Sequence, residues 1–198
     1  TLRHLKSFLS GVFSFALNQG VLNGINPIRE ARIPKKAAAP SETHAATPDE
    51  VLAMMDALEK AGNQKARAAV ALMFFAGLRP GEARGVCWED YDGRQLFVRQ
   101  SVWGTNATPP KTAESAKPVP IIEPLRSVLA ELRQAEGNPE SGPILRGPKA
   151  GRPLNLDNVA RRQVRNVLAK AGIAWHSWYS LRRGIATTLQ SVEKDPMA

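Results

Sequence analysis

The chain has 198 residues and is basic, because 27 lysines and arginines outnumber 18 aspartates and glutamates and give a formal net charge of +9 at pH 7. Its length suits one hydrophobic core, with or without a small appendage, and its charge favours a polyanionic partner, most simply DNA or RNA. The single cysteine, Cys87, excludes an internal disulfide and a cysteine-based zinc site. No apolar stretch approaches the roughly 20 residues that span a bilayer and no signal peptide is visible, so we expect an intracellular, cytoplasmic protein without membrane contact.

The first predicted element is a helix over residues 2–22, where apolar residues recur at helical spacing. Asn18-Gln19-Gly20 is typical of a helix end, and Asn26-Pro27 closes the segment. One amphipathic helix cannot form a core, so we interpret residues 1–26 as the last helix of a domain that begins upstream. Residues 27–46 hold several prolines and a basic cluster, which predicts an extended linker.

A second domain is expected over residues 47–198. Thr47-Pro48-Asp49-Glu50 has the residues of a capping box with proline at the first helical position, and it predicts a helix that runs to about Lys60. The next predicted helix, from about residue 64 to 76, is almost wholly apolar after Arg67 and should therefore be buried.

The pattern changes to strand near the middle of the chain. Residues 96–103 are rich in β-branched and aromatic types and predict a strand, the segment to Lys117 is polar, and residues 118–122 predict a short edge strand. Further helices are expected at about residues 124–136, 157–171 and 180–192. The predicted fold is therefore mainly α with a small antiparallel β-sheet, an α+β class.

One arginine directly follows the buried helix, in Gly77-Leu78-Arg79-Pro80-Gly81-Glu82-Ala83. Pro80 predicts the start of a new helix with Arg79 near its N-cap, where helix-terminal N–H groups also favour an anion. Glu82 then falls at the third helical position. It either caps the helix and pairs with Arg79 in a purely structural role, or supports an arginine whose rigid fork binds a phosphate.

A second arginine lies in Tyr179-Ser180-Leu181-Arg182-Arg183-Gly184, near the C-terminus. If the last helix starts early enough, Tyr179 lies one turn before Arg182 on the same side. Helical spacing predicts that three apolar residues of this helix face the core: Leu181, Ile185 and Leu189.

These two arginine segments, with Lys111 in a predicted turn between them, resemble the tyrosine recombinase family, the phage-integrase type of DNA strand-transfer enzyme. The resemblance implies a DNA breaking-rejoining catalytic domain in which Arg79 and Arg182 bind the scissile phosphate and Glu82 buttresses the site. It also implies that Lys111 protonates the departing 5′ oxygen, with Lys117 as the rival candidate. No metal or other cofactor is expected.

The chain departs from the family pattern at the second arginine box, which reads His-x-x-Arg in the family and Tyr179-x-x-Arg182 here. Because a phenol with a pKa of about 10 is a poor base at neutral pH, Tyr179 is expected to donate a hydrogen bond or to orient the phosphate. Nearby His176 either substitutes for the missing histidine or packs with Trp175 and Trp178.

The family's nucleophilic tyrosine normally lies several tens of residues beyond the second arginine. The tyrosines of this sequence, Tyr91 and Tyr179, do not have that position. We therefore expect residues 1–198 to be a fragment, inactive alone, of a recombinase carried by a prophage or another mobile element.

The resemblance implies double-stranded DNA as the partner, with a monomeric fragment and a tetramer on DNA for the full-length protein. The predicted helix at 157–171 carries Arg161, Arg162 and Arg165, which form either a DNA-backbone contact or an ordinary solvated face. Arg183 is expected to extend this basic surface. The alternatives are a non-catalytic DNA-binding protein with the same fold and a basic RNA-binding or ribosome-associated module.

Overall fold

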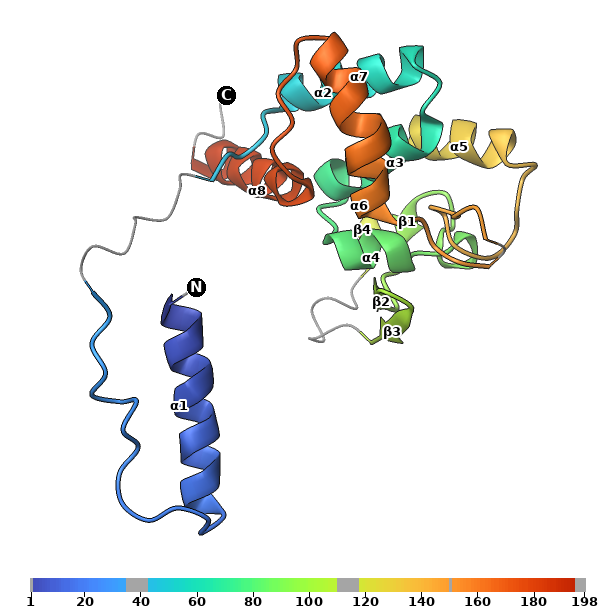
Figure 1. Cartoon of the computed structure of the whole chain (residues 1–198). Coiled ribbons are helices and arrows are strands. Elements are labelled where there is room, and N and C mark those ends of the chain that lie inside the picture. Colours follow the sequence, from blue (N-terminus) through green and yellow to red (C-terminus); the bar gives the residue numbers. More distant parts are fainter. Residues whose placement is uncertain (1, 35–42, 110–117, 150, 195–198) are drawn as a thin grey trace. The chain divides into compact units, whose positions relative to one another are not determined.

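The computed structural model describes residues 2–34, 43–109, 118–149 and 151–194. The chain divides into two compact units, Thr1–Glu42 and Thr43–Ala198. In the described residues helices predominate, and the strands form two small antiparallel sheets of two strands each (Figure 1). The predicted fold class, mainly α with a small antiparallel β component, is confirmed. None of the described helices is both long and apolar enough to cross a bilayer.

The first unit consists of α1 (Leu2–Asn18) and the loop that folds back along it. The side-chain amide of Asn26 donates to the Ser10 carbonyl at 2.8 Å and to the Ser14 hydroxyl at 2.9 Å, and Lys6 Nζ donates to the Ala31 carbonyl at 2.6 Å. The start of the predicted linker therefore packs on α1 instead of running free. Large apolar side chains remain exposed along the rest of this helix: Leu2, Leu5, Phe8, Val12 and Phe15.

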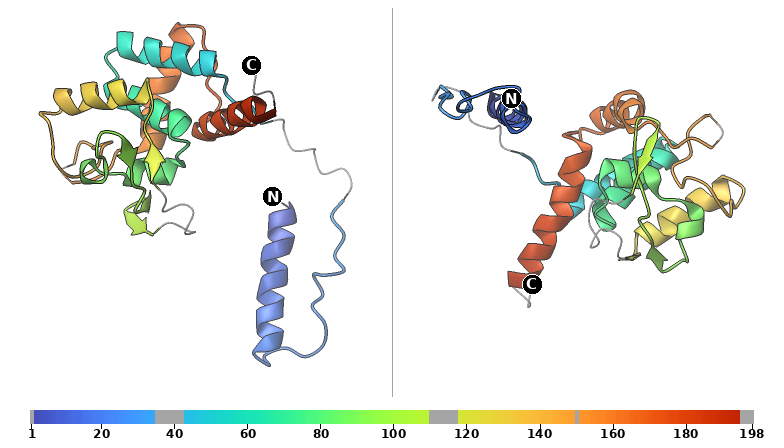
Figure 2. Two further views of the ribbon diagram at one scale, coloured as in Figure 1. Left: turned by 180° about the vertical axis from the view of Figure 1, so that it is seen from behind. Right: turned by 90° about the horizontal axis from the view of Figure 1, so that it is seen from below.

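The core of the second unit is built around α3 (Gln64–Phe75), in which every residue from 68 to 74 is buried, as its apolar sequence predicts. It contacts α2 (Pro48–Lys60), α5 (Leu125–Ala135) and α8 (Trp178–Lys194). In both Figure 1 and Figure 2, α3 lies between α5 and α8. This arrangement brings the C-terminal end of α3 close to the start of α8.

Side-chain caps fix where two of these helices begin. The capping box of α2 forms as predicted, since the Thr47 hydroxyl accepts from the Glu50 N–H at 3.2 Å and the Glu50 carboxylate accepts from the Thr47 N–H at 2.8 Å. Helix α8 begins at Trp178, two residues earlier than predicted, because the Ser177 hydroxyl accepts from the Ser180 N–H at 3.1 Å. This start places Tyr179 on α8.

The second half of α8 extends beyond the body of the unit (Figure 2). Leu181 is fully buried and Ile185 packs against the core, but Leu189 is 56% exposed. The predicted core-facing role of Leu189 is therefore wrong. The predicted helical spacing is correct, but no described element packs on α8 at Leu189.

The strands differ most from prediction. β1 (Gln95–Leu96) pairs with β4 (Val119–Pro120), and β2 (Ser101–Trp103) pairs with β3 (Asn106–Thr108). The single strand predicted at residues 96–103 is wrong, because its two ends belong to different sheets. Gly104, at φ 59°, turns the chain back so that Trp103 pairs with Asn106, and β3 lies in the segment that was expected to be a polar loop.

The helix predicted at 157–171 is a continuous run of α6 (Leu156–Val159), the π-helical turn η3 (Ala160–Val164) and α7 (Arg165–Lys170). It starts at Asn155, whose side-chain carbonyl accepts from the Asn158 N–H at 3.0 Å. One face of this run is buried against the core, and the three arginines considered as DNA contacts lie on its exposed face: Arg161, Arg162 and Arg165.

Candidate active site

The first candidate arginine occupies a sharp corner between two helices. α3 ends at Phe75, Gly77 adopts φ 60°, and α4 (Pro80–Gly85) begins immediately after Arg79. A positive φ of this kind favours glycine. Arg79 is the N-cap residue of α4 with extended backbone, φ −70° and ψ 154°, and Pro80 holds the first helical position, as predicted.

Glu82 fixes Arg79 in two ways. One carboxylate oxygen, Oε2, accepts from the Arg79 backbone N–H at 2.8 Å, and the other, Oε1, accepts from Arg79 Nη1 at 2.7 Å. The Glu82 side chain is only 10% exposed, whereas that of Arg79 is 49% exposed. The capping role proposed for Glu82 is therefore realised, and the Arg79 guanidinium is held in place with one side open to solvent.

Arg182 reaches the same carboxylate from α8. Its Nη1 donates to the Gly77 carbonyl and lies 3.9 Å from Glu82 Oε2. Burial lowers the pKa of the Arg182 guanidinium and the neighbouring Arg79 charge lowers it further, whereas Glu82 and Tyr179 act in the opposite direction. Arginine stays protonated at neutral pH despite such a shift. Two cations thus share one buried anion, and we call Arg79, Glu82 and Arg182 the arginine corner.

The arginine corner carries more positive than negative charge and has fixed geometry. Two guanidinium groups held close together by one carboxylate can donate several hydrogen bonds to a single tetrahedral anion. Their positions are set before any ligand arrives, because backbone and carboxylate contacts already hold both side chains. This arrangement suits the binding of a phosphate that gains charge during reaction.

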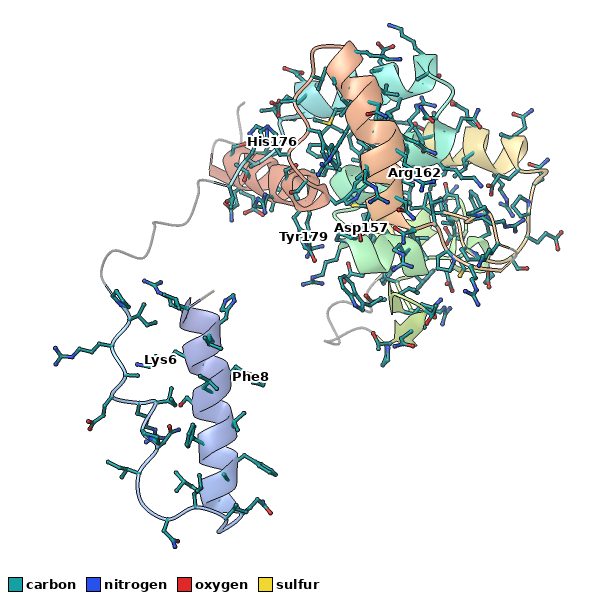
Figure 3. All side chains as sticks on the ribbon, viewed as in Figure 1. Lys6, Phe8, Asp157, Arg162, His176 and Tyr179 are labelled. Carbon is teal, nitrogen blue, oxygen red and sulfur yellow. The ribbon has the colours of Figure 1, made fainter. Side chains whose placement is uncertain are left out.

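The other residues implied by the family resemblance are placed as follows. Tyr179 is exposed in the first turn of α8, near enough to raise the pKa of Arg182 (Figure 3). The candidate proton donor Lys111 and its rival Lys117 both lie outside the described residues.

Tyr91 and Cys87 are poorly suited to act as nucleophiles. The Tyr91 hydroxyl donates to the Gly93 carbonyl at 3.3 Å, and burial raises the pKa of Tyr91. Burial, with help from the Glu89 and Asp90 charges, raises the pKa of Cys87 to about 11. A raised pKa keeps these groups protonated near neutral pH, and protonated hydroxyls and thiols are weak nucleophiles.

His176 is part of a second polar cluster beside the start of α8. Its ring stacks on that of His44, with ring centroids 3.9 Å apart, and His44 Nε2 lies 2.9 Å from Glu50 Oε2. Trp175 and Trp178 pack edge-to-face on each other, with centroids 4.8 Å apart. The stacking partner of His176 is thus His44, which the segment before α2 supplies and which neither alternative for His176 included.

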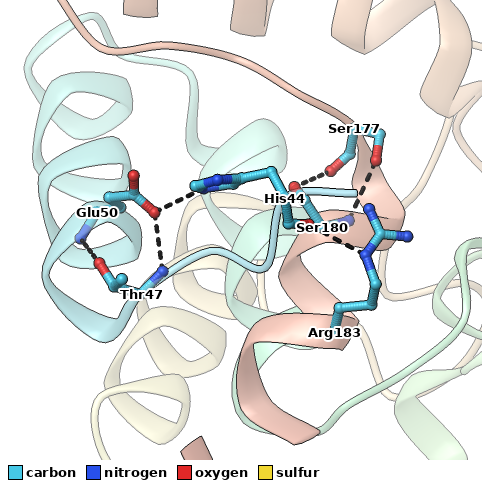
Figure 4. Close-up of polar contacts among 6 residues, drawn as sticks. All are labelled: His44, Thr47, Glu50, Ser177, Ser180 and Arg183. Carbon is cyan, nitrogen blue, oxygen red and sulfur yellow. Dashed lines mark hydrogen bonds and ion pairs between the residues drawn. The ribbon is translucent and has the colours of Figure 1, made fainter. Parts of the chain in front are cut away.

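Arg183 belongs to this second cluster (Figure 4). Its Nε donates to the His44 carbonyl at 3.0 Å, so its guanidinium is half-buried instead of lying freely on a basic surface. Gly184 makes the approach possible, since a Cβ there would lie 2.0 Å from the Ala46 carbonyl oxygen. We call His44, Glu50, His176 and Arg183 the histidine clamp. The Thr47 N–H, and secondarily His44, lower the pKa of Glu50.

Sequence reasoning missed Arg84, which ties α4 to other segments. Its Nε donates to the Leu154 carbonyl at 3.0 Å, its Nη1 to the Val102 carbonyl at 2.9 Å, and its Nη2 to the Gly104 carbonyl at 2.9 Å. Burial lowers the pKa of Arg84, and Asp157 opposes that shift. Nothing in the local sequence distinguishes this arginine from a solvated one. Sequence reasoning also missed the capping role of Ser177 at the start of α8, which its position three residues before Ser180 could have indicated.

The exposed arginines on the α6–η3–α7 run make few contacts with the protein. Arg161 Nη2 donates to the Asn158 side-chain carbonyl at 2.9 Å, and Figure 3 shows Arg162 on the same run near Asp157. These side chains remain accessible to a polyanion. Within the described ranges there is no group of three or more His, Cys, Asp or Glu residues that could hold a metal ion.

The arginine corner lies in a fold that is known from DNA-acting enzymes: the described part of the second unit has the fold of a tyrosine recombinase catalytic domain. The Tn1549 transposon integrase in complex with a circular intermediate DNA matches with a TM-score of 0.73 and 15% identity, over 97% of this chain and 67% of that chain. A lambda integrase tetramer bound to a Holliday junction matches with a TM-score of 0.62 and 22% identity, over 94% of this chain and 51% of that chain.

Sequence comparison points in the same direction. The chain is 26% identical to a tyrosine recombinase XerC-like protein of Caldanaerobacter subterraneus subsp. tengcongensis, over 96% of this chain and 55% of that protein. It is 28% identical to the putative defective protein IntQ of Escherichia coli K12, over 67% of this chain and 34% of that protein. No protein-family model matches the chain. The resemblance to tyrosine recombinases is thus confirmed, and the chain spans only part of the length of these relatives.

Proposed function

We propose that this chain carries the phosphate-binding part of the active site of a site-specific DNA recombinase of the integrase type. The observation that supports this most directly is the arginine corner, where Glu82 contacts Arg79 at 2.7 Å and lies 3.9 Å from Arg182. A structural ion pair needs only one arginine. A second arginine, brought from the other end of the domain to the same carboxylate, supplies the additional donors that suit the binding of a phosphodiester.

The proposed chemistry is a strand exchange at phosphorus. A tyrosine hydroxyl loses its proton to solvent and its oxygen attacks the phosphorus. The bond to the 5′ oxygen breaks, a 3′-phosphotyrosyl link forms, and Lys111 gives a proton to the departing 5′ oxygen. Arg79 and Arg182 bind the non-bridging oxygens as negative charge develops there. Attack of a 5′ hydroxyl on the phosphotyrosine then reverses these steps and rejoins a strand.

We propose that the attacking tyrosine comes from outside residues 1–198. Tyr91 is hydrogen-bonded to the Gly93 carbonyl and has a raised pKa. Tyr179 lies one helical turn before Arg182, where the family has a histidine, and is better placed to donate a hydrogen bond to the phosphate than to attack it. On this proposal the 198-residue chain alone binds DNA but does not cleave it.

The proposed partner is duplex DNA, contacted through the exposed arginines Arg161, Arg162 and Arg165 and steered by the net charge of +9. Arg183, held by the His44 carbonyl, would contribute only a background positive charge. The 198-residue chain is proposed to be monomeric. The similarity in fold to an integrase tetramer on a Holliday junction supports a tetramer on DNA for the whole protein.

The deciding experiment is a search for a covalent protein–DNA adduct on a suicide duplex that carries a nick near the cleavage point. Residues 1–198 should give no adduct that survives denaturation. The protein expressed with the segment that follows residue 198 in its gene should give one, and Arg182→Ala in that protein should lower the rate of adduct formation by about 10²–10³. An adduct through Tyr91 or Tyr179 would contradict the assignment of the nucleophile.

A second candidate function is a non-catalytic DNA-binding protein that keeps the recombinase fold. It is favoured by the environments of Tyr91 and Tyr179, and one similar protein is itself named a putative defective protein. This alternative predicts salt-sensitive duplex binding by the 198-residue chain and no adduct from the longer gene product. The Arg182→Ala substitution would then change DNA affinity alone.

A further inference from the structure

One aromatic side chain is displayed to solvent at the tip of the β2–β3 hairpin. Trp103 is 82% exposed, the largest exposed fraction among the exposed large apolar side chains of the described residues. The residue before it, Val102, is buried, as expected where a strand alternates between the core and solvent. Tryptophan exposes a large apolar surface and is enriched where proteins contact partners.

The hairpin that carries Trp103 is tightly docked on α4. A Cβ at Gly81 would lie 2.4 Å from Ser101 Oγ, and a Cβ at Gly85 would lie 2.4 Å from the Gln100 carbonyl oxygen. A side chain at position 81 would collide with that of Ser101, and one at position 85 would collide with the backbone of Gln100, so both glycines allow the hairpin to pack closely on α4. Figure 1 shows β2 and β3 beside α4.

Hydrogen bonds from α4 hold the hairpin as well. Arg84 donates to the carbonyls of Val102 and Gly104, the residues on either side of Trp103, at 2.9 Å each. The backbone on either side of the exposed indole is therefore held on α4. Helix α4 also has Arg79 as its N-cap residue, so the hairpin and the arginine corner are attached to the same short helix.

The residues around Trp103 in the sequence indicate which class of partner the indole contacts. Residues 93–113 contain no aspartate or glutamate, although the chain has 18 of them. Of the two arginines in this segment, Arg94 is exposed, whereas Arg99 is paired, with its Nε donating to Asp90 Oδ1 at 2.5 Å. Thr105 and Asn106 are exposed at the hairpin tip and can donate hydrogen bonds to phosphate oxygens. An exposed apolar side chain beside hydrogen-bonding groups, on a chain with a net charge of +9, is complementary to nucleic acid.

We propose that Trp103 makes an apolar contact in a groove of duplex DNA, next to the phosphate bound at the arginine corner. This inference rests on the proposed function for its partner and goes beyond it by assigning a contact that is independent of charge. The indole lies against sugars and base edges, as apolar side chains do when they enter a groove. It therefore adds affinity that salt does not screen, whereas the exposed arginines supply the salt-dependent part.

The test measures affinity of the 198-residue chain for a labelled 30-base-pair duplex by fluorescence anisotropy at several salt concentrations. Trp103→Ala should weaken binding about tenfold at every salt concentration, since removing the apolar surface of a contacting indole from water contributes an energy of this order. The slope of affinity against salt should be unchanged. Trp103→Phe should keep most of the affinity, and Arg161→Ala should lower the slope by about one instead.

Leu52→Ala is the matched control, because Leu52 is an exposed apolar residue on α2, and it should bind as the unmodified chain does. Circular dichroism and thermal melting should show that Trp103→Ala folds normally, since its indole makes little contact with the core. Acrylamide quenching adds an independent readout: duplex DNA should protect an indole of the unmodified chain, and this protection should be missing from Trp103→Phe.

Several outcomes would overturn the inference while leaving the proposed function intact. They are Trp103→Ala binding within twofold of the unmodified chain, a loss that comes with a changed salt slope, and a larger loss on single-stranded than on duplex DNA. Self-association that Trp103→Ala abolishes would assign the indole to a second copy of this chain. Absence of any duplex binding at low salt would instead contradict the proposed function, and the Trp103 contact with it.

Discussion

Helices α2 and α4 start with the same local arrangement, but the two starts serve different purposes. Each has an extended N-cap residue, proline at the first helical position and glutamate at the third. In both, the glutamate accepts a hydrogen bond from the N-cap N–H at 2.8 Å. The N-cap side chains differ: Thr47 caps α2 through its hydroxyl, whereas Arg79 makes no side-chain cap on α4.

Because of this difference, α4 lacks a stabilising side-chain cap that α2 has. A threonine N-cap typically stabilises a helix by about 1 kcal/mol, and α4 does without it. In its place α4 has a guanidinium that shares Glu82 with Arg182. The corresponding glutamate of α2, Glu50, contacts His44 and helps to hold the segment before α2 against α8. Departures from local preference of this kind are expected at functional sites, which agrees with the role proposed for Arg79.

The largest effect is expected from removing the charge of Glu82. Glu82→Gln leaves Arg79 and Arg182 close together without their shared anion, and should lower the free energy of unfolding by about 2 kcal/mol, less than for a fully buried pair because both arginines are partly exposed. Glu50→Gln, the matched change in α2, should cost less than about 1 kcal/mol at neutral pH, since Glu50 is more exposed. Urea unfolding measures the free energy of unfolding of both variants. Equal losses would show that Glu82 and Glu50 contribute equally to stability and would contradict the prediction.

The second prediction exchanges the two N-cap residues. Thr47→Arg should cost about 1 kcal/mol, because α2 loses its cap. Arg79→Thr gains a cap and loses a half-exposed ion pair, so the free energy of unfolding should change by less than about 1 kcal/mol. Duplex affinity at low salt should fall for Arg79→Thr alone. If Arg79→Thr were strongly destabilising, Arg79 would be a structural residue and the functional interpretation of the corner would be wrong.

The smallest effect concerns acid stability at the histidine clamp. Because the folded state lowers the pKa of Glu50, chiefly through the Thr47 N–H, the ionised carboxylate stabilises the fold above its ordinary pKa of about 4.3. That contribution is lost as pH falls through the lower folded value. The stability difference between the unmodified chain and Glu50→Gln should therefore shrink from pH ~6 to pH ~3. Asp56→Asn, which changes an exposed pair, is the control, and a difference that stays constant with pH would contradict the prediction.

Most helices of this protein could be predicted, because their determinants are local. A capping box at Thr47, an apolar run before Gly77 and a proline after Arg79 each act within one or two helical turns. The strand prediction failed for the opposite reason. Residues 96–103 are rich in strand-forming side chains. Which of these residues pair depends on partners at Val119 and Thr108, and no local pattern specifies those partners.

The sequence alone thus determined where the chain forms helices and which residue types are available for chemistry, because caps and turns depend on hydrogen bonds between near neighbours. Only the tertiary structure decided which of those residues act together. The Arg182 guanidinium reaches the carbonyl of Gly77 across 105 positions, and Arg183 reaches His44 across 139. Adjacent arginines on one helix point to different partners. Packing against α3 and α4 brings Arg182 to Glu82, where we propose a phosphate site, and packing against the segment before α2 holds Arg183 on the His44 carbonyl.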